Sequence, residues 1–156
     1  LHARFGQPIL IDTFVGGREF RVGIVGDALL PFLEVDFSAL PPDAPRMVGY
    51  STKWHYDSVE FKSVHFHCPP DIDEATSRAL ADIGRRTADA FGLQRCSRLD
   101  IRMDADGALY VLDVNPNPDL SPMAAMHAMA EASDARFAGM IGRLLDLALE
   151  ARRKDD

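Results

Sequence analysis

The part of the sequence that most limits the fold is RLDIRMDADGALYVLDVN, residues 98–115. Apolar and polar residues alternate on both sides of Asp106-Gly107. An Asp-Gly pair flanked by such alternation is a strong signal for a β-hairpin. We therefore expect strands over 98–104 and 109–115 that pair with each other, and with them an antiparallel sheet.

A two-residue loop at Asp106-Gly107 would fix which residues of these strands face each other. Asp100 would lie opposite Asp113 and Arg98 opposite Asn115, with all four on one face because side chains alternate along a strand. The other face would carry the apolar residues Leu99, Ile101, Met103, Tyr110, Leu112 and Val114. A longer loop would change this register.

The opposed aspartates suggest a metal site. Directly opposed residues have Cβ atoms roughly 5 Å apart, and like charges there repel unless a cation lies between them. Mg²⁺ is usually held by one or two carboxylates together with substrate phosphates. Asn115 would add a neutral oxygen, and Arg98 a planar fork suited to phosphate or carboxylate. The alternative that spacing alone leaves open is a solvated strand face.

The remaining elements follow from periodicity and capping residues. In chain order we expect a hairpin of strands 8–15 and 19–25 around Gly16-Gly17, strands 28–35 and 59–66, a helix from an N-cap at Asp71 to Gly92, a final helix over 134–151 and a charged tail over 152–156. Residues 38–58 are expected to form an irregular loop. The predicted fold is α+β, a mainly antiparallel sheet with helices packed on one face.

Composition excludes several classes of function. The chain has 156 residues, enough for one domain with its own core. Its net charge of −7 argues against a nucleic-acid surface, although a carboxylate-bound metal can still hold a nucleotide. The only two cysteines favour a reducing, cytoplasmic setting. No apolar run is long enough for a membrane span.

Several motifs together resemble one family. Arg98-x-Asp100 with Leu112-Asp113-Val114-Asn115-Pro116-Asn117-Pro118 resembles the C-terminal signature of ATP-grasp enzymes, nearest the D-alanine–D-alanine ligase-like branch. Residues 9–15 with Gly17-Arg18-Glu19-Phe20 resemble the family's hinge strand and the following strand, and residues 50–54 its lysine-bearing loop. The resemblance implies that residues 1–151 are the C-terminal part of an ATP-grasp domain. The phosphate-covering Gly-rich loop and the other ATP-binding lysines would lie upstream of Leu1.

The resemblance also implies residue roles. Asp100, Asp113 and Asn115 would bind Mg²⁺, or Mn²⁺ in its place, with Asp113 bridging two ions. Arg98 would contact the transferred phosphoryl group, and Lys53 would lie in the loop that closes over the phosphates. Trp54 and Tyr56 would cover the nucleotide or simply anchor that loop. The adenine pocket would be lined by Asp12, Thr13, Phe14 and Val15, and Glu19 would bind the ribose hydroxyls.

The implied reaction is ATP-dependent ligation. A small-molecule carboxylate would attack the γ-phosphate to give an acylphosphate and ADP, and an amine (or thiol) would then displace phosphate. A homodimer of the full-length protein is compatible with this reading. We do not expect the 156-residue chain alone to complete a catalytic cycle.

The sequence also departs from the family. Asp113 and Asp12 stand where Glu is common, Asp119 follows Pro118 where D-alanine ligases have Gly, and Ala124 falls near their acceptor-binding Ser. We therefore expect an acceptor other than D-alanine, and Asp119 would favour a cationic or amino group. The alternatives are a non-catalytic nucleotide- or metal-binding module and a metal-dependent hydrolase.

Overall fold

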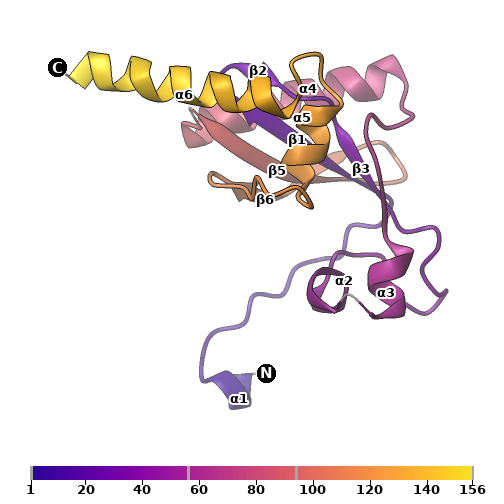
Figure 1. The fold of residues 1–156 in the computed structure, drawn as a ribbon. Helices are drawn as coiled ribbons and strands as arrows, with labels where there is room; N and C mark the ends of the chain where they lie inside the picture. Colours follow the sequence, from indigo (N-terminus) through magenta and orange to yellow (C-terminus); the bar gives the residue numbers. More distant parts are fainter. Residues whose placement is uncertain (1, 56, 94, 156) are drawn as a thin grey trace.

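The computed structural model describes residues 2–55, 57–93 and 95–155. Its elements in chain order are α1 (His2–Phe5), β1 (Arg18–Val25), β2 (Ala28–Leu29), β3 (Leu33–Asp36), α2 (Tyr50–Trp54), α3 (Val59–Ser63), β4 (His65–His67), α4 (Glu74–Phe91), β5 (Cys96–Met103), β6 (Leu109–Asn115), α5 (Ala125–Glu131) and α6 (Arg136–Asp155). The sheet has the order β4-β3-β1-β5-β6, β2 pairs with β1, and every pairing is antiparallel. Figure 1 shows this sheet between the helices, with α1, α2 and α3 hanging away from it.

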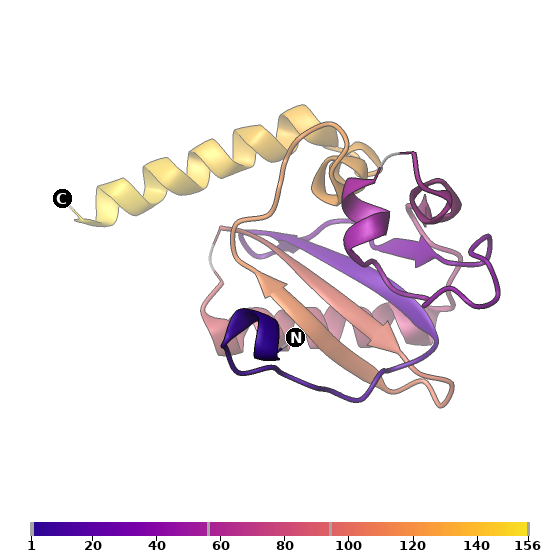
Figure 2. The same cartoon turned by 90° about the horizontal axis from the view of Figure 1, so that it is seen from below.

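One face of the sheet is covered by α4. In Figure 2 this helix runs behind the sheet. Alternate residues of β1 point toward this helix and are fully or almost fully buried. The cluster consists of Phe20, Val22, Ile24, Leu80, Leu99 and Ile101. Gly84 of α4 makes the close approach possible, because a Cβ there would lie 3.0 Å from Val22. This layer is the first of two hydrophobic cores.

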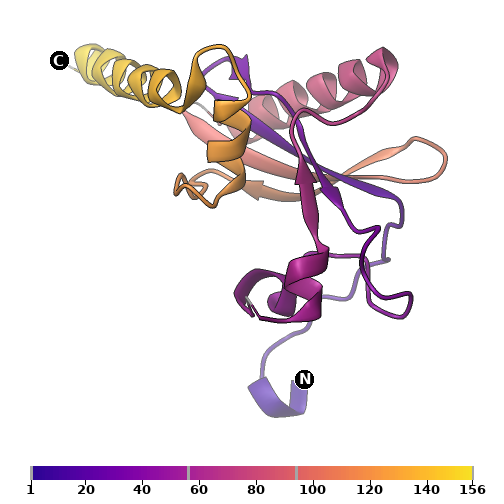
Figure 3. The same ribbon diagram turned by 45° about the vertical axis from the view of Figure 1, so that its right-hand side comes forward.

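The second core lies on the other face, where α5 and α6 pack over β1 and β3 (Figure 3). Its centre includes Leu33 and Val35 of β3 and the fully buried Met126 and Met129 of α5. The predicted α+β class with a mainly antiparallel sheet is confirmed. The helices lie on both faces, but α5 and α6 leave the β5–β6 part of their face open, and charged residues occupy it.

The predicted limits of α4 were partly right. Its N-cap is Asp73, not Asp71, because the Asp73 side chain accepts a hydrogen bond from the backbone N–H of Thr76 at 2.7 Å. Gly92 ends the helix in the left-handed conformation, with φ 63°, as predicted.

Several predicted strands are absent or shorter. Residues 8–15 are irregular and pair with no strand among the described residues, so the hairpin around Gly16-Gly17 was wrong. Residues 59–66, predicted as one strand, form the short helix α3 and the start of β4. Residues 28–35 are divided between β2 and β3. Residues 152–155, expected as a tail, continue α6.

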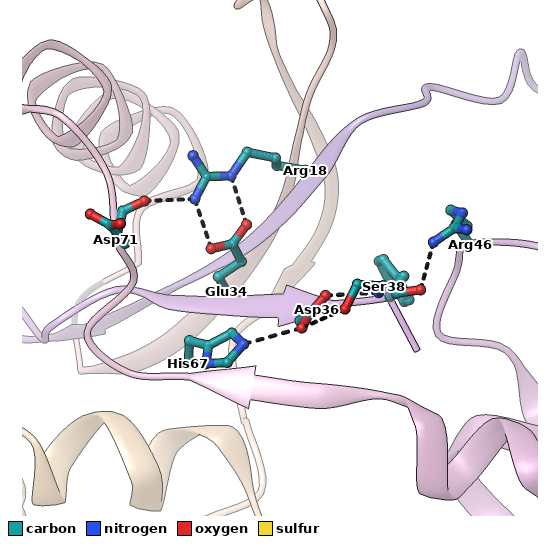
Figure 4. Close-up of polar contacts among 8 residues, drawn as sticks. Arg18, Glu34, Asp36, Ser38, Arg46, His67 and Asp71 are labelled. Carbon is teal, nitrogen blue, oxygen red and sulfur yellow. Dashed lines mark hydrogen bonds and ion pairs between the residues drawn. The ribbon is translucent and has the colours of Figure 1, made fainter. Parts of the chain in front are cut away.

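Polar contacts hold both ends of the segment between β3 and α4, residues 37–73 (Figure 4). Arg18 donates two hydrogen bonds to the Glu34 carboxylate, at 2.6 and 2.7 Å, and one to the backbone carbonyl of Asp71. His67 Nε2 lies 3.2 Å from Asp36 Oδ2, which joins β4 to the end of β3. Arg46 donates to the carbonyl of Phe37 at 2.6 Å. The Arg18 and His67 contacts join the two ends of this segment to the sheet, while α2 and α3 in its middle project away from it.

Candidate functional site

The β5–β6 hairpin sets the predicted charges opposite one another. Asp100 pairs with Asp113 and Arg98 with Asn115, as the sequence predicted. The loop is longer than two residues, however, because Met103 pairs with Leu109. A β-bulge between these two parts, with Leu112 as the extra residue, restores the predicted register at the aspartates. Bulges of this kind occur next to functional sites, where they redirect side chains.

The bulge also corrects the prediction for the apolar face. Leu112 does not join the core but is 52% exposed and lines the same cavity as Asp100 and Asp113. Tyr110, 43% exposed, pairs with Arg102 and donates a hydrogen bond to Asp104. The prediction that Tyr110 and Leu112 lie on the face opposite Asp100 and Asp113 was therefore wrong.

Arginines lie between and beside the opposed aspartates. Arg98 donates to both oxygens of Asp100, at 2.7 and 3.1 Å, and its Nη2 lies 4.0 Å from Asp113 Oδ2. The Nε of the buried Arg21 is 3.9 Å from Asp100 and has no hydrogen-bond partner among the described residues. Burial lowers the pKa of Arg21, although Asp100 opposes this effect. Protein cations thus already relieve the repulsion that suggested a metal.

The donor set still fits a hard divalent ion. The Asp113 side chain is 59% exposed, and Asn115 accepts from the backbone of Asn117 at 2.9 Å through an oxygen that has a second lone pair. In the described part of the chain no group of three or more His, Cys, Asp or Glu side chains converges. Two carboxylates and one amide oxygen suit Mg²⁺, which completes its coordination with water and phosphate.

A cavity of about 320 Å³ lies beside these aspartates. It is lined by Asp12, Thr13, Phe14, Val15, Glu19, Met47, Val48, Lys53, Asp100, Arg102, Leu112 and Asp113. All the predicted site residues except Arg98 and Asn115 are in this set, although they come from four separated parts of the sequence. Arg98 touches the cavity wall through Asp100. Tyr56 and the side chain of Trp54 lie outside the described residues.

Sequence reasoning missed four of the described residues that line the cavity. Met47 and Val48 come from the irregular loop, where no periodicity marks them, and Leu112 depends on the bulge. Arg102 could have been found, because it follows Arg98 and Asp100 at strand spacing and therefore shares their face.

A larger groove of about 1100 Å³ lies between β6 and α4. Among the described residues that line it, Asp113 is the only predicted site residue. We assign the candidate site to the smaller cavity, because that cavity gathers the charged groups.

Glu19 and Arg102 form a buried ion pair on the cavity wall, with 2.9 Å between Arg102 Nη2 and Glu19 Oε2. Burial raises the pKa of Glu19, and the attraction of Arg102 opposes the increase. A buried ion pair is weak support for stability, because the desolvation of two charges offsets their attraction.

The raised pKa of Glu19 predicts a pH dependence of stability. Between its ordinary value of about 4.3 and the raised value, the native carboxyl holds a proton that the unfolded one has lost. This contribution is complete below the unfolded pKa and is lost as pH rises through the folded pKa. Relative to Glu19→Gln, the wild-type free energy of unfolding should therefore fall as pH rises from about 4 through the raised folded pKa. Urea titrations at several pH values measure it, and parallel curves for the two proteins would contradict the prediction.

Asp119 is engaged within its own loop. Its carboxylate accepts from the backbone N–H of Ser121 at 2.8 Å and from the Ser121 hydroxyl at 3.0 Å. These bonds lower the pKa of Asp119 and keep it ionised. Its oxygens thus stabilise the turn after Pro118, which is a structural role beside any contact with substrate.

None of the helices in residues 2–55, 57–93 and 95–155 combines the length and the apolar character that a membrane span requires.

The sheet, the opposed aspartates with their arginine and the adjoining helix α2, which carries Lys53, define a class of fold, the C-terminal subdomain of ATP-grasp proteins. The structure superposes on D-alanine–D-alanine ligase from Bacillus anthracis with a TM-score of 0.73, 15% identity, and coverage of 93% of this chain and 44% of that one. For the structure of the same enzyme complexed with ATP, the TM-score is 0.71 at 15% identity, and the superposition covers 92% of this chain and 43% of that one.

Sequence comparison gives the family. Residues 2–146 match the family described as D-ala D-ala ligase C-terminus, and the chain belongs to it. It is 29% identical over 149 residues to D-alanine–D-alanine ligase from Chromohalobacter salexigens, covering 92% of this chain and 42% of the relative. It is 26% identical over 146 residues to D-alanine–D-alanine ligase from Pseudoalteromonas translucida, covering 94% of this chain and 44% of that relative. The chain thus spans less than half the length of these relatives.

Proposed function

We propose that this chain forms the metal- and nucleotide-binding half of an ATP-dependent ligase that joins a small-molecule carboxylate to an amine. The observation that carries the proposal is the opposed pair Asp100–Asp113, bridged by Arg98, at the wall of a cavity that also contains Lys53. Membership of the D-ala D-ala ligase C-terminus family supports it. The free thiols of Cys68 and Cys96 are consistent with a cytoplasmic enzyme.

The cavity has the character that a nucleotide needs. Phe14, Met47 and Leu112 offer apolar surface to a base, and backbone groups of residues 12–15 offer hydrogen bonds. Glu19, on the same wall, would accept hydrogen bonds from ribose hydroxyls. Lys53, which also lines the cavity, would neutralise phosphate charge.

Phosphoryl transfer then depends mostly on positioning and charge neutralisation. Asp100, Asp113 and Asn115 would hold Mg²⁺, or Mn²⁺, which when bound supplies positive charge to the phosphate oxygens. Arg98 would stabilise the charge on the transferred group. A substrate carboxylate oxygen bonds to the γ-phosphorus as the bond to the ADP oxygen breaks. An amine nitrogen then bonds to the acyl carbon, loses a proton, and phosphate leaves.

We further propose an acceptor other than D-alanine. In this chain the loop after Asn115 carries Asp119, held ionised by Ser121. A negative charge there would repel the carboxylate of an amino-acid acceptor and favour an amine without an acidic group nearby.

The first experiment is calorimetric titration of the natural full-length protein with ATP, with and without Mg²⁺. We expect binding that requires Mg²⁺ and weakens by about 10-fold to 100-fold in Asp113→Asn, because the anionic carboxylate is replaced by a neutral amide with a single oxygen. Asp113 is largely exposed, so the variant should fold normally. Asp106→Asn, in the exposed hairpin loop, is the matched control.

The outcomes separate the proposal from its rivals. Metal-independent ATP binding, unchanged in Asp113→Asn, would favour a non-catalytic nucleotide-binding module. An absence of ATP binding together with Mg²⁺-dependent hydrolysis of simple phosphate esters would favour a hydrolase.

A further inference from the structure

Arg102 is an almost completely buried guanidinium in the cavity wall, 2% exposed. Its Nε donates to Glu19 Oε2 at 3.0 Å and its Nη2 lies 2.9 Å from the same oxygen. Its Nη1 donates to the carbonyl of Val15 at 3.2 Å, and Nη2 also donates to the carbonyl of Arg46. One side chain of β5 thus binds the segment before β1, β1 itself and the loop after β3.

Two aromatic rings fix the guanidinium in place. Its carbon lies 5.1 Å from the ring centroid of Phe14 and 5.2 Å from that of Phe37. Both distances are in the range of cation–π attraction, which strengthens when the cation is desolvated. Arg102 therefore holds together several segments beside the cavity, and few of these contacts could be made by another residue type.

The two carboxylate oxygens of Glu19 have different surroundings. Both contacts from Arg102 go to Oε2. Oε1 accepts no hydrogen bond from any described residue. It is not fully buried, so it remains partly accessible to solvent. It is therefore the acceptor that Glu19, on the cavity wall, has available for a ligand hydroxyl.

We propose that Arg102 is a positioning residue that holds Glu19 with one oxygen toward the cavity and thereby sets the preference for nucleotides that carry ribose hydroxyls. The inference rests on the proposed function, because it assumes that the cavity binds ATP. Arg102 itself does not touch the reacting atoms.

The test compares the affinity of the full-length protein for ATP and for 2′,3′-dideoxyadenosine triphosphate in the presence of Mg²⁺. The wild type should prefer ATP by about tenfold or more, the size expected for hydrogen bonds to a charged acceptor. In Arg102→Met this ratio should fall to about one, because Glu19 loses its orientation. A merely structural role would weaken both nucleotides equally and leave the ratio unchanged.

Arg102→Met leaves Glu19 buried without a partner and can impair folding. Arg102→Lys is the second variant: it keeps the charge but cannot make the forked contacts, so the ratio should fall several-fold while the protein folds. Arg86→Met, at an exposed position of α4, is the matched control and should retain the wild-type ratio.

Three results would overturn the inference. A wild-type ratio of one means that Glu19 does not read the ribose, while the ligase proposal stands. A wild-type ratio that persists in a folded Arg102→Lys or Arg102→Met means that Arg102 does not position Glu19. A wild type that binds neither nucleotide removes the proposed function as well.

Discussion

Replacement of Arg98 by methionine is expected to lower kcat of the full-length enzyme by roughly 10³-fold or more, the effect typical of an arginine that stabilises a transferred phosphoryl group. The affinity for the metal ion should not fall together with kcat. Arg98 occupies both oxygens of Asp100 in the structure, so its removal frees that carboxylate. We therefore expect Mn²⁺ affinity to be unchanged or higher in Arg98→Met. Product formation and Mn²⁺ titration measure the two effects separately.

The control is Arg95→Met, which removes an exposed arginine just before β5. It should retain the kcat and metal affinity of the wild type. Wild-type kcat in Arg98→Met would show that Arg98 only neutralises the aspartates. A loss of Mn²⁺ binding would show instead that it supports the metal site.

Gly17→Ala is expected to destabilise the chain by roughly 2–4 kcal/mol. Gly17 has a φ of 96°, and a Cβ at this position would lie 2.2 Å from the backbone oxygen of Met103. Relief of this clash requires either β1 or the end of β5 to move. Urea unfolding should show a lower midpoint with an unchanged slope.

Gly16→Ala offers a matched comparison one residue earlier. No atom lies within 4 Å of its added Cβ, and its φ is outside the left-handed region. Its effect should stay within about 0.5 kcal/mol. Equal stability of the two variants would mean that the approach of residue 17 to β5 is looser than described.

Sequence signals within a short stretch of the chain predicted the β5–β6 hairpin. The Asp-Gly turn and the alternation around it predicted the β5–β6 hairpin and the pairing of Asp100 with Asp113. The loop was predicted too short, and the bulge at Leu112 compensated for that error. A one-residue bulge depends on packing against the rest of the sheet, which the sequence of two strands does not encode.

Other errors came from treating strand preference as a property of the backbone. Residues 8–15 are rich in β-branched and aromatic residues, but such residues favour a pleated, half-buried surface, and no described strand pairs with this segment. The Glu19–Arg102 pair was missed for a related reason. The two residues are far apart in the chain, and only the pairing of β1 with β5 brings them together.

The segment before β1 also has a practical consequence for handling the isolated chain. Leu10 and Ile11 are 85% and 87% exposed, and the neighbouring Ile9 and Phe14 are also exposed. A short apolar stretch of high β-propensity, unpaired and open to solvent, is a template for intermolecular strand addition. Preparations of these 156 residues alone should therefore self-associate as concentration rises, and charged residues introduced at Leu10 and Ile11 should keep them monomeric.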